Sequence, residues 1–101
     1  MPRIQADIPT DKIADFCRKW RIVELSLFGS VLRDDFSPES DIDVMVEFAP
    51  GAGWSLFDIL AMQEELQEIF GRQVDIVEKA GLKNPFRRHA ILRDREIIHA
   101  S

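Results

Sequence analysis

The feature that most constrains the fold of this chain is an apolar segment that ends in Gly29-Ser30 and is followed, after ten residues, by an alternating segment. Residues 22–28 are rich in side chains that favour β-structure, and residues 41–48 place apolar and polar side chains in turn. Such a period of two predicts a β-strand with one set of side chains on each face. One set is Ile42, Val44, Val46 and Phe48, and the other is Asp41, Asp43, Met45 and Glu47. The stretch therefore predicts a strand, a turn, a polar connection and a second strand.

The two aspartates of the second strand point the same way. Asp41 and Asp43 are two residues apart, so their Cα atoms are expected to lie about 6.5 Å apart. Both carboxylates can then reach one metal ion or a close pair, and oxygen ligands of this kind suit Mg²⁺. Taken alone, the pair is more typical of the solvated face of a half-exposed strand.

The turn before the second strand favours the functional interpretation. Gly29 allows a tight turn with close backbone approach, and Ser30 offers an N–H and a hydroxyl to a phosphate oxygen. A strand, a phosphate-binding turn and two metal-binding carboxylates together form a set that is suited to handling a nucleotide.

This combination resembles the signature of the polymerase-beta-type nucleotidyltransferase superfamily. The fuller pattern resembles the minimal nucleotidyltransferases of that superfamily, and it comprises Gly29, Ser30, Arg33, Asp35, Ser40, Asp41, Ile42, Asp43 and Val46. The resemblance covers about residues 25–99. It implies a third carboxylate on a later strand, where Asp75 lies within Val74-Asp75-Ile76-Val77.

The resemblance also implies an activity and a partner. It implies a Mg²⁺-dependent transfer of AMP from ATP to a hydroxyl of a HEPN-domain toxin, which silences the toxin and makes this protein an antitoxin. A hetero-oligomer with the toxin is expected on the same ground. The choice of ATP as donor, the HEPN-domain partner and the transfer of AMP to that partner do not follow from spacing or composition.

Each candidate residue has an expected role in nucleotidyl transfer. Two Mg²⁺ ions bound by Asp41 and Asp43 are expected to clamp the attacking and departing oxygens, and Asp75 either takes the proton of the acceptor hydroxyl or completes metal coordination. The residues expected to bind the nucleotide are Gly29, Ser30, Arg33 and Ser40. For Arg33, contact with the phosphates and a surface pair with Asp35 remain equal alternatives.

Composition sets limits on the class of protein. The 101 residues predict one domain, 1–101, with its core at about 22–99. Thirteen basic and eighteen acidic residues give a net charge of −5, which argues against direct binding of nucleic acid. Cys17 is the only cysteine, so no intrachain disulfide can form and a reducing compartment is expected. No apolar run is long enough to span a membrane and no signal peptide is evident, so a cytoplasmic location is expected.

The remaining segments predict an α+β fold, with a small mixed sheet flanked by helices in two layers. A helix with Thr10 as N-cap is expected to place Cys17 on its apolar face as an inert buried thiol. A second helix is expected between a Ser55–Asp58 capping box and a C-cap at Gly71, with a wet side rich in Glu and Gln. Its predicted apolar stripe is Leu56, Ile59, Leu60, Leu66, Ile69 and Phe70. A strand at 73–77, a helix from Asn84-Pro85 to about Leu92 and a strand at 96–99 complete the pattern.

Several polar or aromatic residues have ordinary structural explanations. Trp54 is expected to cover the start of the second helix, with stacking on a base or a partner as the alternative. Arg87, Arg88 and His89 form the one basic cluster, which is typical of a solvated helix and less typical of a phosphate or partner site. The spacing of His89 and His99 does not indicate a zinc site.

Two other functions remain as alternatives to protein adenylylation. One is an antitoxin that neutralises the toxin by binding alone, although such a protein has no physical need for clustered carboxylates. The other is transfer to a small-molecule hydroxyl, such as that of an aminoglycoside.

Overall fold

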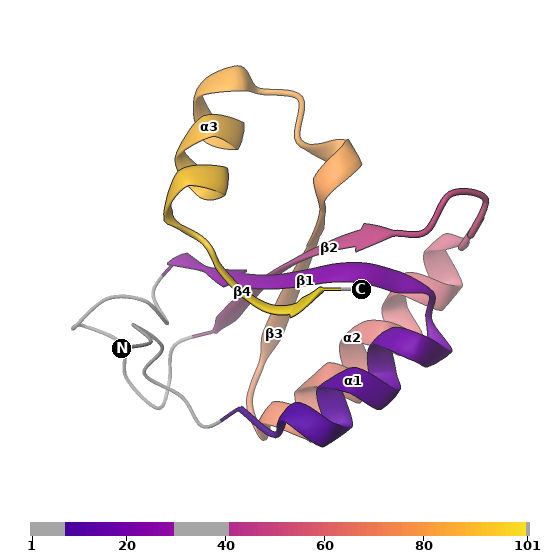
Figure 1. Ribbon diagram of the computed structural model, residues 1–101. Coiled ribbons are helices and arrows are strands. Elements are labelled where there is room, and N and C mark those ends of the chain that lie inside the picture. The colour runs from indigo at the N-terminus through magenta and orange to yellow at the C-terminus, as the bar shows by residue number, and fades with distance from the viewer. Residues whose placement is uncertain (1–7, 30–40, 101) are drawn as a thin grey trace.

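The fold is a four-stranded sheet between helices, seen in a computed structural model that describes residues 8–29 and 41–100 (Figure 1). The elements in chain order are α1 (Thr10–Lys19), β1 (Ile22–Phe28), β2 (Ile42–Phe48), α2 (Leu56–Phe70), β3 (Val74–Glu78), the 3₁₀ turn η2 (Lys79–Gly81), α3 (Pro85–Asp94) and β4 (Glu96–Ala100). The predicted α+β architecture is confirmed. In the described ranges, no helix has the length and apolar character needed to cross a membrane.

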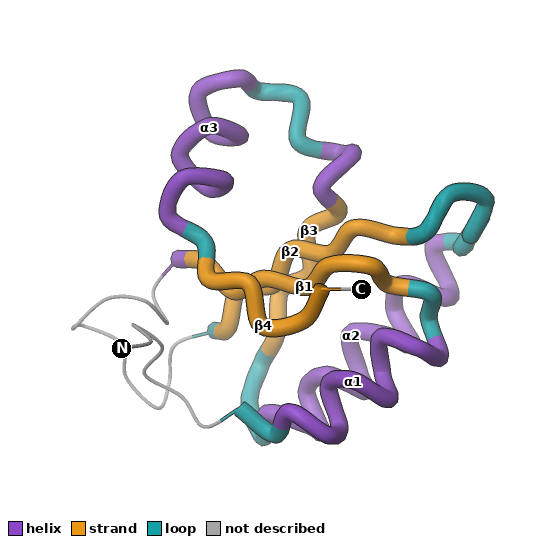
Figure 2. The backbone as a smooth tube through the Cα atoms, viewed as in Figure 1, coloured by secondary structure: helices purple, strands orange, loops and turns teal. Residues whose placement is uncertain are grey.

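The sheet is mixed, with strand order β3-β2-β1-β4 (Figure 2). β1 pairs antiparallel with both β2 and β4, whereas β2 and β3 run parallel. The parallel pair needs a crossover, and α2 supplies it. The amino ends of β2 and β3 therefore lie together at one end of the sheet, next to the point where β1 ends.

One face of the sheet carries the main core. α1 and α2 lie side by side against this face (Figure 1). Their buried side chains, among them Phe16, Cys17, Met62 and Leu66, pack with the apolar set of β2 that the alternation predicted. The predicted apolar stripe of α2 was wrong for Leu56 and Leu60, which are 72% and 50% exposed. Met62, which was not predicted, is buried instead.

The opposite face is covered by α3. Phe28, Met45, Leu82 and Ile91 form a second, smaller buried cluster on that side. Met45 is only 1% exposed although it belongs to the same face as Asp41 and Asp43. The second face of β2 is thus buried at Met45 and carries carboxylates on either side of it, with Asp41 and Asp43 at the amino end and Glu47 near the carboxyl end.

The ends of the helices follow the expected chemistry with one exception. Ser55 and Asp58 form the complete capping box of α2, and Gly71 ends this helix in a left-handed conformation. Asn84 caps α3 through its side chain, and Pro85 is the first helical residue. The prediction for α1 was wrong: Pro9 is the N-cap, it makes no side-chain cap, and Thr10 is already helical.

Candidate functional site

The candidate site lies where the end of β1 meets the start of β2. Phe28 is the register partner of Asp43 in the antiparallel pair, so Gly29 leaves the sheet directly beside this aspartate. Gly29 has φ +77°, a left-handed conformation that favours glycine. A Cβ atom on Gly29 would collide with Oδ2 of Asp43 and lie 3.2 Å from its Cγ. The carboxylate of Asp43 therefore occupies the space that the missing side chain leaves open.

The neighbouring strand brings a second carboxylate to the same place. Asp75 is the register partner of Asp43 in the parallel pair, and strands paired in this way lie about 4.8 Å apart. Both residues belong to the face that carries Met45 and Val77, since these are the next register pair on that side. The predicted meeting of the second and third strands is confirmed, and with it the placement of Asp75 beside Asp43.

Asp41 completes the row at the beginning of β2. It is exposed and immediately precedes the strand, while Asp43 is half-buried and Asp75 is exposed. The backbone N–H of Ile42 donates to the carbonyl of Gln73 over 2.9 Å, which ties the starts of β2 and β3 together. Alternation along the strand places Asp41 on the same face as Asp43.

The carboxylate set fits magnesium in its chemistry. Carboxylate oxygens at the exposed end of a strand are the donors that Mg²⁺ prefers. Within ranges 8–29 and 41–100, no three His, Cys, Asp or Glu side chains are already gathered closely enough to hold a metal ion. A shared metal ion would therefore need the aspartate side chains to lie closer together than they do here.

Three further candidates fall outside the described residues. These are Ser30, Arg33 and Ser40, which were expected to bind the nucleotide together with Gly29. Their roles stay predictions.

The family follows from comparison with known proteins. The model of the family described as "Nucleotidyltransferase domain" matches residues 11–98. The chain belongs to this family. Gly29, Asp43 and Asp75, which the fold brings together, all lie inside the matched range.

Sequence relatives share most of their length with this nucleotidyltransferase. A provisionally named protein adenylyltransferase of Methanocaldococcus jannaschii is 36% identical over 89 residues, covering 88% of this chain and 87% of the relative. The protein adenylyltransferase MntA of Thermococcus cleftensis is 28% identical over 81 residues, covering 80% of this chain and 77% of the relative.

Solved structures share the fold. A structure provisionally described as a minimal nucleotidyltransferase has a TM-score of 0.71 at 31% identity, with 86% of each chain covered. A toxin–antitoxin structure with AMP-PNP has a TM-score of 0.74 at 18% identity, covering 93% of this chain and 75% of that one. A complex of a tri-AMPylated Shewanella oneidensis HEPN toxin with its MNT antitoxin has a TM-score of 0.65 at 18% identity, covering 91% and 70%.

Two other expectations concern aromatic and acidic side chains. Trp54, which lies just before α2, packs on Trp20 at the end of α1: its indole N–H donates to the carbonyl of Trp20 over 2.7 Å, and the two rings meet edge to face at 5.2 Å. Glu65 on the wet side of α2 is more than a solvated charge, because Lys19 and the indole of Trp20 each donate to it over 3.0 Å. These contacts join the end of α1 to α2 and its preceding residue, and they give Trp54 and Glu65 a structural role.

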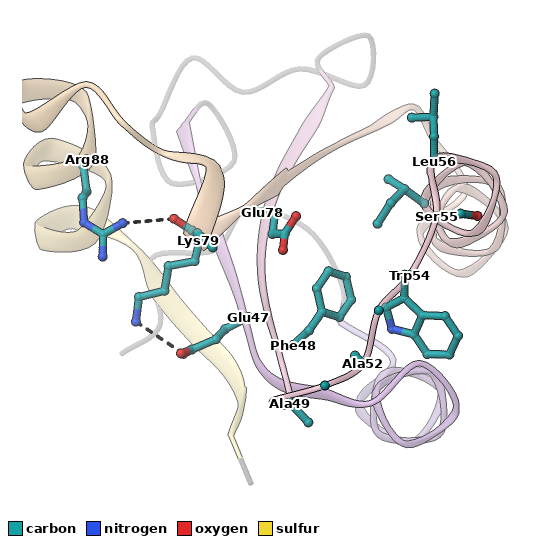
Figure 3. Close-up of a pocket in the computed structure, with 14 residues that line it drawn as sticks. Glu47, Phe48, Ala49, Ala52, Trp54, Ser55, Leu56, Glu78, Lys79 and Arg88 are labelled. Atoms are coloured by element: carbon teal, nitrogen blue, oxygen red, sulfur yellow. Dashed lines mark hydrogen bonds and ion pairs between the residues drawn. The ribbon is translucent and has the colours of Figure 1, made fainter.

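A hollow of about 830 Å³ at the other end of β2 was not predicted from the sequence (Figure 3). Residues of the β2–α2 connection line it together with Lys79 and Arg88. The nearest signal in the sequence is the Gly51–Gly53 connection, which marks a turn but does not reveal what packs opposite to it.

Proposed function

We propose that this protein transfers AMP from ATP to a hydroxyl of a partner protein, in a Mg²⁺-dependent reaction. The observation that carries the proposal is the seating of the Asp43 carboxylate over the side-chain-free Gly29, with Asp75 in register beside it. This arrangement places a turn suited to phosphates against carboxylates suited to metal. The match of the nucleotidyltransferase family to residues 11–98, which include these residues, supports the proposal that triphosphate and acceptor meet here.

Each residue of the site has a separate role in an in-line displacement at phosphorus. The acceptor hydroxyl attacks the α-phosphorus of ATP, a new P–O bond forms, and the bond to pyrophosphate breaks. Gly29 and Ser30 hold the terminal phosphates, with Arg33 and Ser40 as further contacts, and this fixes the direction of attack. Asp75 accepts the proton that the hydroxyl loses. Asp41 and Asp43, with Asp75 as a third ligand, would hold Mg²⁺, which supplies charge neutralisation at the attacking and leaving oxygens.

The comparisons support a protein as the acceptor. The two sequence relatives carry names that describe protein adenylyltransferases, and one structural neighbour is the antitoxin bound to a tri-AMPylated HEPN toxin. Another neighbour is a toxin–antitoxin structure with an ATP analogue. We extend these properties to this chain as an antitoxin that modifies a HEPN-domain toxin with AMP in the cytoplasm, where ATP is available.

Intact-mass measurement tests the proposal directly. The protein is co-expressed with the HEPN-domain protein that is encoded beside it, and the purified proteins are incubated with Mg²⁺ and ATP. The expected result is a gain of one or more AMP units on the partner. A stable complex without a mass change would overturn transfer and favour neutralisation by binding alone.

A double variant assigns the chemistry to the carboxylates. Asp41→Asn with Asp43→Asn is nearly isosteric, so the melting temperature is expected to change little while transfer is lost. Asp11→Asn with Asp15→Asn is the matched control, because both aspartates are exposed on α1, away from the site. Transfer at the wild-type rate by the Asp41/Asp43 variant would refute the assigned roles.

A further inference from the structure

The hollow at the carboxyl ends of β2 and β3 has two chemically different walls. Trp54 and Leu56 lie on one side of it, and Lys79 and Arg88 lie on the other, with Phe48 between them (Figure 3). Lys79 is paired with Glu47, its ammonium nitrogen 3.4 Å from the carboxylate. The hollow thus offers one occupant an apolar wall and a charged wall, and Glu47 and Glu78 line it together with Lys79 and Arg88.

The apolar wall continues onto the surface of α2. Leu56, Phe57 and Leu60 are 72%, 82% and 50% exposed, and they lie in the first two turns of this helix. The capping box of Ser55 and Asp58 holds the same turns rigidly. Exposed apolar side chains that are grouped on a rigid element beside a hollow are typical of protein-binding surfaces.

The charged wall contains the guanidinium of Arg88, and only part of its N–H groups form hydrogen bonds to residues that the structure describes. One terminal nitrogen of Arg88 donates to the carbonyl of Lys79 over 3.0 Å. In the described part of the chain, no carboxylate forms an ion pair with Arg88. The N–H groups of Arg88 that do not bond to Lys79 therefore suit a carboxylate of the occupant.

The position of the hollow indicates the size of the occupant. Asp43 lies near the amino end of β2 and Phe48 ends the strand, so about 17 Å of strand separates the carboxylate site from the hollow. An acceptor that fills the hollow and presents a hydroxyl at the carboxylates has to span this length. A folded protein does so readily.

We propose that the hollow and the exposed start of α2 form the docking surface for the protein acceptor. The acceptor inserts an apolar side chain against Leu56 and Phe57 and places a carboxylate on Arg88. This inference rests on the proposed function, in which the acceptor is a protein. Binding energy from this remote contact holds the acceptor while its hydroxyl reacts at the other end of β2.

Paired variants test the apolar wall. Phe57→Ser is expected to weaken binding of the purified HEPN-domain partner about tenfold or more. Phe86→Ser is the control, because Phe86 is 87% exposed on α3 and belongs neither to the lining of the hollow nor to the exposed start of α2. The dissociation constants are measured by titration calorimetry, and a value for Phe57→Ser within twofold of wild type would overturn the proposal. An equal loss with Phe86→Ser would overturn it as well.

A second pair of variants tests Arg88 on the charged wall. Arg88→Glu is expected to weaken binding, whereas Arg87→Glu on the same helix changes the charge equally at a residue that does not line the hollow. Equal effects of the two charge reversals would overturn the role of Arg88.

Transfer of AMP is measured in parallel, so that the two proposals fail separately. If wild type transfers AMP and the hollow variants bind normally, the docking surface is wrong and the proposed function stands. If no AMP is transferred but the hollow variants weaken the complex, docking stands and the transfer proposal fails. If wild type forms no complex with the partner, the docking proposal is overturned. With both proposals correct, saturating partner restores transfer in Phe57→Ser, because only binding is weakened.

Discussion

At the scale of single residues, the site depends on an absent side chain as much as on those present. Gly29 is left-handed, and its missing Cβ leaves the space in which the Asp43 carboxylate lies. Gly71 at the end of α2 has nearly the same conformation, with φ +71°, but no atom lies within 4 Å of the position of a Cβ. The two glycines therefore separate the cost of backbone conformation from the cost of displacing a carboxylate.

Alanine at Gly29 is expected to lower both stability and activity. The left-handed conformation costs a residue with a Cβ about 1 kcal/mol, and the new methyl group also pushes Asp43 away from the turn. We expect a lower melting temperature together with a loss of AMP transfer, measured by thermal unfolding and by intact mass of the acceptor.

Gly71→Ala is the control for this prediction. It carries the same conformational cost of about 1 kcal/mol but leaves the carboxylates untouched. A smaller fall in melting temperature than for Gly29→Ala, with normal transfer, is expected. Equal transfer by the two variants would show that the contact between Gly29 and Asp43 does not matter for the reaction.

At the scale of elements, the first turns of α2 hold the apolar wall of the hollow in place. Ser55 accepts a hydrogen bond from the backbone N–H of Asp58, and the carboxylate of Asp58 accepts one from the N–H of Ser55. Ser55→Ala is expected to cost about 1 kcal/mol of folding free energy and to lower the melting temperature by about 4 °C.

Thr10→Ala is the matched control for the loss of a cap. Thr10 was expected to cap α1 but is its first helical residue, after Pro9 as the N-cap, and alanine is the better helix former by about 0.5 kcal/mol. Its melting temperature is expected to stay at or slightly above that of wild type. An equal fall in the two alanine variants would contradict the capping role of Ser55.

The sequence predicts the elements better than the extent of their burial. Alternation in residues 41–48 sets the strand and its faces, and it places Asp43 and Asp75 correctly once the strands pair. Helical periodicity gives the direction of an apolar stripe but not how much of the helix the sheet covers. Leu56 and Leu60 were therefore misplaced in the core, while the buried residues of α2 are Met62 and Leu66.

The hollow could not be predicted for a different reason. Its walls come from the end of β2, the start of α2, η2 and α3, which are separated in sequence and meet only in the fold. No local pattern records that Arg88 faces Trp54 and Leu56 across this space. The basic cluster of α3 therefore reads as an ordinary solvated helix until its neighbours are known.

At the scale of the whole molecule, the two faces of the sheet carry separate buried clusters, and the two ends of β2 carry separate sites. α1 and α2 seal the larger core on one face, and α3 covers the middle of the other, so that β2 carries chemistry at its start and the hollow at its end. Substitutions at the two ends of β2 are expected to change the free energy of unfolding additively, because sites more than about 10 Å apart usually contribute independently to stability.

Cys17 reports on the integrity of this assembly. It is fully buried where α1 packs on the sheet, and burial raises the pKa of its thiol from 9.0 to about 12. Below pH 9 the thiol is protonated in both folded and unfolded chains, so it contributes no pH dependence. Between pH 9 and 12 the unfolded chain loses the proton while the folded chain keeps it, and stability falls.

Urea unfolding at pH 8 and pH 10 measures this effect. From the lower to the higher pH, wild type is expected to lose about 1.4 kcal/mol more stability than Cys17→Ala. The alanine variant starts from a lower stability because of the cavity that it leaves, so the comparison is between the two changes with pH and not between the two stabilities. Equal changes in both proteins would mean that the thiol ionises as readily in the folded chain as in the unfolded one, and that α1 does not seal the core.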